Sequence, residues 1–307
     1  MIIRERPSVW HLFFILRGSI LPRIIGPLLA TIAIAVAVTA AHGRLFDTKI
    51  TLTPIPFSLI GLALAIFLGF RNSASYDRWW EARKLWGELL IRTRSLSRLW
   101  LNHVETTTDT DPGESGMQIG RLIAFAYALK HTLRGAGEER ASAFLPPEDL
   151  AQPAHAVNPP DHILRRFSAT LAQAARQGRV APMMVAEMEA NLTALAGIQA
   201  GCDRIRTTPL PFPYTLMLHR TAYLYCLMLP FGLVDSIGFT TPLVVGLISY
   251  TFFGLDALGD EIEEPFGILP NDLPLDTLCR RVEIDLRAAR GERELPEVPK
   301  PVDFCLM

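Results

Sequence analysis

The sequence predicts an all-α membrane protein in which four transmembrane helices continue into a helical region outside the bilayer. The first observation is a set of four stretches with almost no charge, at residues 24–43, 50–70, 221–234 and 236–255. All but the third have the roughly 20 residues that a helix needs to cross a hydrocarbon core. The second observation is composition: half of the residues are hydrophobic, yet the mean hydropathy is only +0.24. A chain that lies partly in lipid and partly in water has this balance.

The orientation follows from the arginines that precede the first stretch, which are Arg4, Arg6, Arg17 and Arg23. Positively charged segments beside a span tend to stay in the cytoplasm. The short connection after the first span then faces outside, and each later span reverses the direction of the chain. We therefore expect both termini of this multi-pass protein to lie in the cytoplasm.

This orientation divides the chain into five segments. They are a cytosolic N-terminal segment (1–23), the first two spans (24–70), a helical cytosolic region (71–212), two further spans (213–255) and a cytosolic tail (256–307). The last two spans form a hairpin that we expect to turn around residues 235–238.

The cytosolic region is predicted to be helical. Residues 79–100 and 183–205 repeat apolar side chains every three or four positions, which is typical of amphipathic helices. Residues 105–116 are rich in Thr, Asp and Gly, and residues 135–161 contain five prolines. Both segments predict surface loops.

Several classes of function are disfavoured by the composition and the motifs. The net charge is −1, so the chain as a whole lacks the basic character of a nucleic-acid-binding protein. The sequence contains no Gly-rich phosphate loop, no His-Glu-x-x-His and no nucleophile elbow, so we expect neither an enzyme nor a cofactor. The four cysteines have no metal-ligand spacing and predict free thiols: Cys202, Cys226, Cys279 and Cys305.

The second span carries two parallel stripes at four-residue spacing. A stripe of small residues, which favours close approach of helices in a bilayer, consists of Gly61, Ala65 and Gly69. A neighbouring stripe of large apolar residues consists of Leu62, Ile66 and Phe70. The large residues either pack on other helices and lipid, or surround an axis as apolar rings that gate ions by dewetting. No Gly or Pro follows at residues 70–81, so the helix is expected to continue into the cytosol.

Four motifs in consistent order make the chain similar to the prokaryotic bestrophin homologues. Residues 70–87 read FRNSASYDRWWEARKLWG, and residues 6–10 read RPSVW. Residues 208–214 read TPLPFPY, and PFG at residues 265–267 is followed by NDLPL at residues 271–275. The resemblance covers nearly the whole chain.

The resemblance implies a homo-oligomer, a pentamer in the lipid bilayer, with one central pore that passes monovalent ions. The family's narrow neck is an apolar triplet on the second span, eight residues before an Arg-Trp-Trp. Phe70 lies eight residues before Arg78, so Leu62, Ile66 and Phe70 match the neck position for position. The family's second, cytosolic constriction falls at Val185, with Met184 as the alternative. For a prokaryotic member we expect the bacterial inner membrane.

Animal bestrophins bind calcium through a run of carboxylates just after Pro-Phe-Gly, and this sequence departs from that pattern. Here Ile268, Leu269 and Pro270 follow instead. Calcium takes six to eight oxygen ligands, so calcium gating of the animal kind is not expected. No metal site is therefore predicted, and only weak candidates remain in the acidic segment: Glu261, Glu264 and Asp272. A solvated helix end is the favoured interpretation of that segment.

Two ion selectivities are compatible with the sequence. Animal members pass chloride and characterised prokaryotic members pass monovalent cations, so the resemblance favours cations, with an anion channel as the alternative. A secondary transporter is a further alternative, but no span has a central charge and no internal repeat is visible. A scaffold that binds partners through the cytosolic helices is a fourth hypothesis.

Overall fold

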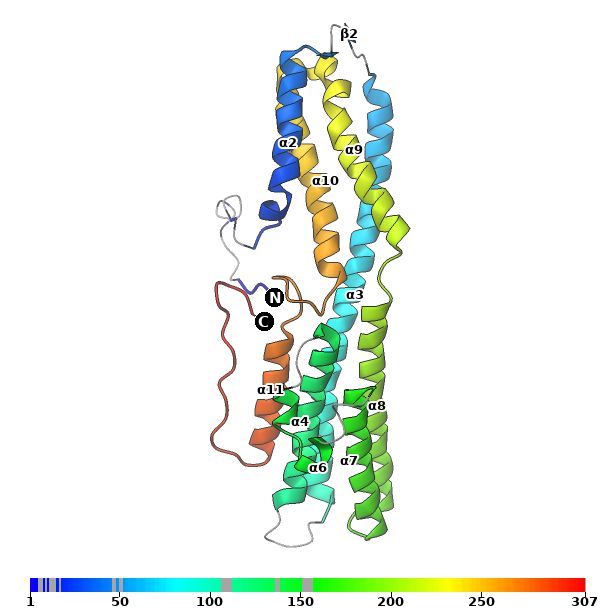
Figure 1. Ribbon diagram of the computed structural model, residues 1–307, viewed down its shortest axis with the longest axis vertical. Coiled ribbons are helices and arrows are strands. Elements are labelled where there is room, and N and C mark those ends of the chain that lie inside the picture. Colours follow the sequence, from blue (N-terminus) through cyan, green and yellow to red (C-terminus); the bar gives the residue numbers. More distant parts are fainter. Residues whose placement is uncertain are drawn as a thin grey trace. The chain divides into compact units, whose positions relative to one another are not determined.

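Helices make up nearly all regular structure in the described part of the chain (Figure 1). The computed structural model describes residues 1–4, 8, 10, 15–16, 18–45, 48–49, 52–105, 112–135, 139–150 and 157–306. Within them, only β1 (Arg44–Leu45) and β2 (Thr48–Lys49) are strands, paired antiparallel. Arg6 and Arg17, and most of the motif at residues 6–10, lie outside the described residues. The all-α expectation is confirmed.

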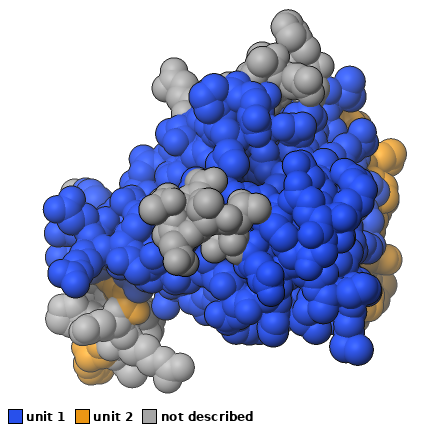
Figure 2. All heavy atoms as spheres, turned by 90° about the horizontal axis from the view of Figure 1, so that it is seen from below, with its two compact units in different colours: residues 1–3, 80–208, 265–307 blue, residues 4–79, 209–264 orange. Residues whose placement is uncertain are grey.

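The chain forms two compact units, which Figure 2 colours separately. Unit 1 comprises residues 1–3, 80–208 and 265–307, and unit 2 comprises residues 4–79 and 209–264. The helix α3 (Pro54–His103) contributes residues to both units.

Unit 2 contains the apolar helices. They are α2 (Leu21–Ala40), the first part of α3, α9 (Phe212–Ile237) and α10 (Thr241–Glu263), with the 3-10 turn η2 (Gly238–Thr240) between the last two. Within this unit, α9 and α10 lie between α2 and α3 (Figure 1). Its core contains side chains from all four helices, including Ile24, Leu68, Cys226 and Phe253.

Among the described residues, three helical stretches are long and apolar enough to cross a membrane: Leu21–Ala40, Pro54–His103 and Phe212–Glu263. The third stretch reverses direction at η2 and so supplies two helices, which gives the four that the sequence predicts. The turn lies slightly later than predicted, because α9 continues past Asp235 to Ile237. Gly238 then adopts a positive φ of 53°, a conformation that glycine tolerates best.

Unit 1 is a helical bundle. It contains the remainder of α3, α4 (Pro112–Arg134), α5 (Glu139–Ser142), α6 (Pro147–Leu150), α7 (Pro159–Arg176), α8 (Pro182–Thr207) and α11 (Leu275–Ala289). Helix α4 is buried continuously through its middle turns, and Trp100 of α3 packs edge-on against Phe167 of α7 with ring centroids 5.4 Å apart.

The two predicted loops are partly wrong. Helix α4 already begins at Pro112, inside the first of them, and the second contains α5, α6 and the start of α7. Proline lacks the N–H that the first turn of a helix leaves unpaired, so it begins helices readily. At α7, Pro159 is the first residue of the helix. The side chain of Asn158, just before it, caps the first turn by accepting a hydrogen bond of 3.2 Å from the backbone N–H of Asp161.

Candidate functional site

The three large apolar residues of the second span share one exposed face of α3. The side chains of Leu62, Ile66 and Phe70 are 62%, 48% and 65% exposed. Other large apolar residues of unit 2 are exposed to the same degree, such as Leu59 of α3 and Leu247 of α10, so exposure alone does not separate a pore-facing from a lipid-facing side chain. We call these three residues the neck residues.

The opposite face of α3 is buried. Four residues of this face are almost fully covered, and they follow one another at intervals of four, three and four positions: Leu64, Leu68, Arg71 and Ser75. With about 100° between successive residues, they share one side of the helix and the neck residues lie on roughly the other. The rotation of α3 about its axis is therefore set by what its buried face contacts.

Arg71 is the chemically distinctive member of the buried face. Its guanidinium is fully buried, and Nη1 donates a hydrogen bond of 2.7 Å to Oδ1 of Asp256 on α10. Nη2 donates to the carboxylate of Asp260, one turn further along α10. The second carboxylate oxygen of Asp256 lies 2.7 Å from Nδ1 of His219 on α9. We call Arg71, Asp256, Asp260 and His219 the Arg71 cluster.

The Arg71 cluster joins α3, α9 and α10 one residue beyond Phe70. A buried charge is tolerated only when it is paired and hydrogen-bonded, so Arg71 must keep its side chain turned toward α10. Phe70, about 100° away on the same helix, is then held on the exposed side. The cluster thus positions a neck residue without touching it.

The end of α10 is fixed to its neighbours by Glu263. Its main-chain oxygen accepts a hydrogen bond of 3.2 Å from Nε of Arg78, and its side-chain Oε1 accepts one of 3.0 Å from the backbone N–H of Leu210. Its other carboxylate oxygen lies 3.8 Å from Nη2 of Arg71. Polar groups from α3, α10 and the segment before α9 therefore meet at this end of unit 2.

Close packing between α3 and α10 depends on Gly259. A β-carbon there would lie 2.4 Å from Oδ1 of Asn72 and 3.6 Å from Cζ of Arg71. Such a contact is impossible without movement, so Gly259 makes room for the polar residues that follow the neck.

The small-residue stripe is divided between two environments. A β-carbon at Gly61 would lie 2.6 Å from the hydroxyl oxygen of Tyr225 on α9, so Gly61 allows packing within one chain. Ala65 and Gly69 are exposed, and a β-carbon at Gly69 would meet nothing within 4 Å. Only the latter two remain free for packing against a second copy.

The other predicted site residues are distributed over both units. Met184 and Val185 are half-buried in the first turn of α8, next to the exposed Met183. Glu261 is buried near the end of α10, and Glu264 is exposed just after it. Asp272 is buried in unit 1, where its Oδ2 accepts a hydrogen bond of 2.6 Å from the backbone N–H of Leu269 and stabilises a turn.

Among the described residues, no group of three or more His, Cys, Asp or Glu side chains is arranged to hold a metal ion. The acidic end of α10 instead supplies Asp256 and Asp260 to Arg71.

The sequence interpretation missed the partners of Arg71 and the role of His219. A signal was present: Asp256, Asp260 and Glu263 recur at four and three positions along α10, so they share one face. Asp256 is also the first charged residue after the fourth apolar stretch, as Arg71 is after the second.

Comparisons with known proteins agree with the helical architecture. The family model for bacterial and fungal bestrophin proteins matches residues 1–288. A voltage-dependent anion channel-forming protein of Mesorhizobium japonicum is 45% identical over 294 residues, which cover 95% of this chain and 93% of that protein. A voltage-dependent anion channel-forming protein of Escherichia coli K12 is 42% identical over 298 residues, which cover 96% of both chains.

A solved structure of a bestrophin homologue has a similar fold. A bacterial bestrophin homologue from Klebsiella pneumoniae, solved by Zn-SAD phasing, has a TM-score of 0.82 and 38% sequence identity to this chain. The match covers 88% of this chain and 100% of the other.

Proposed function

Because the chain belongs to the bacterial and fungal bestrophin family of ion channels, we propose that its copies form a pentamer around one pore lined by the neck residues. The chain is then a membrane channel and not an enzyme. The observation that carries the proposal is the exposure of Leu62, Ile66 and Phe70 on the side of α3 opposite its buried face.

The neck residues are suited to act as a gate. Rings of large apolar side chains around a narrow axis disfavour water, and ions cannot pass where water is absent. Three rings at four-residue spacing extend over about 12 Å of helix. A second constriction, at Val185 or alternatively Met184, belongs to the same proposal.

The proposed location is the bacterial inner membrane, with both termini in the cytoplasm. The arginines before the first span support this orientation. The proposed membrane segments are residues 24–70 and 213–255, with residues 71–212 and 256–307 in the cytosol.

We propose that the channel passes small anions. The support is the names of its relatives, which describe voltage-dependent anion channel-forming proteins. These names favour the anion alternative over the cation selectivity that the resemblance alone suggested. An apolar neck does not set the sign of the ion, which depends on the field of charges beside it.

Cation selectivity remains a second candidate because of one structural observation. Arg71 is buried and held by two carboxylates, so its charge is not available to attract anions. Near the inner end of the neck, α3, α9, α10 and the residue just after α10 carry three arginines and six carboxylates: Arg71, Arg78, Arg220, Asp77, Asp256, Asp260, Glu261, Glu263 and Glu264. Their summed field attracts cations.

A planar-bilayer recording in asymmetric NaCl separates these outcomes. The proposal predicts unitary current steps and a reversal potential near the equilibrium potential of chloride. A reversal potential near that of sodium would replace the anion assignment by the cation candidate. Saturable, coupled flux without unitary steps would contradict the channel itself and support a secondary transporter.

A further inference from the structure

Asp77 is the first exposed charged residue of α3 after the neck residues. Between Leu62 and Asp77 the helix carries one other charge, that of Arg71, and this side chain is fully buried. Asp77 is exposed, as Phe70 and Ser73 are before it. These three residues follow one another at intervals of three and four positions, the spacing that keeps side chains on one face of a helix. The row of neck residues therefore continues to Asp77.

Two arginines set the direction of Asp77. Arg71 and Arg78 are seven residues apart, and seven residues turn a helix by about 700°, which is about 20° short of two full turns. The same spacing separates Phe70 from Asp77. Arg71 pairs with carboxylates of α10, and Nε of Arg78 donates a hydrogen bond of 3.2 Å to the main-chain oxygen of Glu263 at the end of that helix. With both arginines turned toward α10, Asp77 is held on the side of Phe70.

Asp77 follows the neck closely along the helix axis. Seven residues correspond to about 10 Å of helix, so the carboxylate lies about two turns beyond the ring of Phe70. In a pentamer, five copies bring five carboxylates to the same level around the axis. This step rests on the proposed function, because the row of neck residues faces the axis only if α3 lines the pore.

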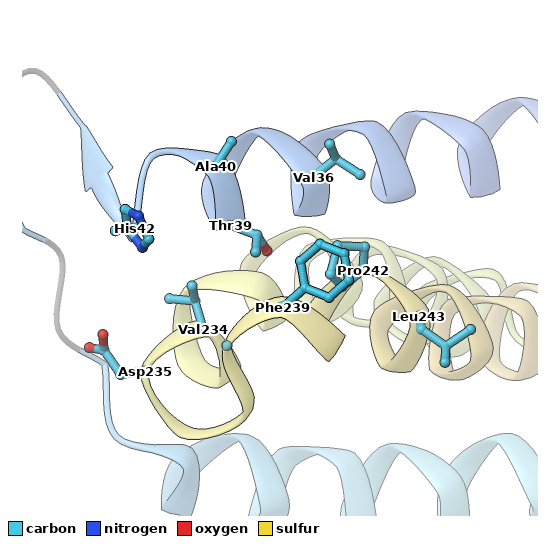
Figure 3. Close-up of a pocket in the computed structure, with 10 residues that line it drawn as sticks. Val36, Thr39, Ala40, His42, Val234, Asp235, Phe239, Pro242 and Leu243 are labelled. Carbon is cyan, nitrogen blue, oxygen red and sulfur yellow. The ribbon is translucent and has the colours of Figure 1, made fainter.

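The other end of the neck has no equivalent charge on α3. The helix is uncharged from Pro54 to Phe70. At that end of unit 2, a groove of about 870 Å³ lies between α2 and the turn from α9 into α10, with His42 and Asp235 among its lining residues (Figure 3). No described residue of α3 lines this groove. On the row of neck residues, the charge of α3 therefore lies at the inner end only.

We propose that the Asp77 carboxylates form a ring that controls the ion concentration at the inner mouth of the pore and makes conduction asymmetric. A ring of like charges concentrates ions of opposite sign and depletes ions of its own sign. In an anion channel, the ring depletes anions at the cytosolic mouth and reduces their exit from the cell, which is the inward current. In a cation channel, it enriches cations there and increases their exit, which is the outward current. In both cases the ring raises the ratio of outward to inward current.

The test is the current–voltage relation of single channels in inside-out patches from giant bacterial spheroplasts that express the chain, where the cytosolic face is known. In symmetric KCl at about 0.1 M, Asp77→Asn should lower the ratio of outward to inward current about twofold. At about 1 M KCl, where the Debye length is about 3 Å, this difference should nearly vanish. Charges at the outer mouth are the same in both proteins, so the change reports the inner mouth.

Glu264→Gln is the matched control. Glu264 is exposed, and it follows the residue whose main-chain oxygen accepts the hydrogen bond from Arg78, so it lies at a similar level to Asp77. Its carboxylate, however, lies just after α10, the helix that packs on the buried face of α3. Glu264→Gln should therefore leave the ratio close to the wild-type value. An unchanged ratio in Asp77→Asn, or an equal fall in Glu264→Gln, overturns the proposal.

A second measurement changes the charge at position 77 after the channel has folded. Asp77→Cys is combined with Cys305→Ser, which removes the half-buried native thiol. Within one recording, a negatively charged methanethiosulfonate reagent on the cytosolic face should restore the wild-type ratio, and a positively charged one should lower the ratio further. Equal effects of the two reagents overturn the proposal.

These recordings separate the role of Asp77 from the proposed function. Asp77→Asn raises the inward current if anions pass and lowers the outward current if cations pass. The ratio falls in either case, so it tests Asp77 whichever ion the channel selects. Unitary currents with an unchanged ratio contradict the role of Asp77 alone, whereas the absence of unitary currents in the wild type contradicts the channel and the ring together.

Discussion

Arg71 and Phe70 are adjacent in sequence, and the structure gives them opposite environments. Arg71 is fully buried among carboxylates, and Phe70 is largely exposed. On a helix, neighbouring residues point about 100° apart, so one anchored side chain fixes the direction of the next. The residues that line the proposed pore and those that hold them in place are therefore different residues, with different expected phenotypes.

For the neck residues we expect changes in conductance without loss of folding. Alanine at Leu62, Ile66 or Phe70 removes a large exposed side chain, which widens the ring and makes it easier to wet. Each single variant should raise unitary conductance severalfold in planar bilayers, and the triple variant more. Leu224→Ala is the matched control on α9 and should conduct as the wild type does. Unchanged currents in the triple variant would contradict the gate.

For Arg71 we expect a loss of folding stability. Arg71→Met leaves Asp256 buried without its main cationic partner, a loss of about 3–5 kcal/mol in the free energy of unfolding. The double variant Arg71→Met with Asp256→Asn removes both charges of this pair and should recover part of that stability. The measurement is the thermal unfolding midpoint in detergent. Equal midpoints for the wild type and Arg71→Met would show that the cluster does not hold α3.

At the scale of helices, the approach of α10 to α3 depends on one missing side chain. A β-carbon at Gly259 would collide with Asn72, so Gly259→Ala should destabilise the protein by about 1–3 kcal/mol, the usual cost of overpacking. Asn72→Ala in the same chain removes the colliding oxygen and should restore the unfolding midpoint. If Asn72→Ala did not restore the midpoint, the contact with Asn72 would not be the cause of the destabilisation.

Helices α4 and α11 of unit 1 are joined by a titratable ion pair. Oδ1 of Asp276 lies 2.6 Å from Nζ of Lys130, and Oδ2 lies 2.6 Å from Nη1 of Arg134. Burial raises the pKa of the Asp276 carboxyl, but hydrogen bonds from these two cations and their charges outweigh burial and hold the pKa below its ordinary value of 3.8.

The sign of the pH dependence follows from this lowered pKa. Asp276 binds protons less readily in the folded state, so its contribution to stability is complete above pH 3.8 and is lost as the pH falls through its folded pKa. Asp276→Asn should therefore lower the unfolding midpoint at neutral pH, with a difference from the wild type that shrinks on acidification. A difference that stays constant below pH 3.8 would contradict the assignment.

The helices themselves could largely be predicted from the sequence, because apolar periodicity and span length are local signals. The continuous helix through residues 70–81 and the helical segments around residues 79–100 and 183–205 are confirmed. The predicted loops were partly wrong because Pro112, Pro147 and Pro159 begin helices in this chain. The Arg71 cluster was missed because its ion pairs join residues 185 and 189 positions apart. Such contacts depend on how α3 and α10 are rotated, which no local pattern specifies.

For the whole molecule, the family and the fold agree with the sequence interpretation, and the pentamer remains a prediction. Gly61 packs against Tyr225 within one chain, so of the small-residue stripe only Ala65 and Gly69 are left for the predicted packing against a second copy. Gly69→Leu should place a large side chain on the exposed face of α3 and reduce the pentamer seen by size-exclusion chromatography with light scattering. Ile55→Leu, a conservative change at an exposed residue of the same helix, is the control. An intact pentamer in Gly69→Leu would contradict close packing at this face.

The central claim is that Ile66 faces a water-filled pore and not lipid, and cysteine modification tests it most directly. Burial raises the pKa of the Cys202 and Cys279 thiols to about 12, so neither forms a reactive thiolate at neutral pH. Cys226 is also buried, and Cys305→Ser removes the half-buried fourth thiol. In this background, a charged, membrane-impermeant thiol reagent should abruptly reduce the current of Ile66→Cys in a planar bilayer and leave Leu224→Cys unaffected. A current through Ile66→Cys that the reagent does not change would contradict the account.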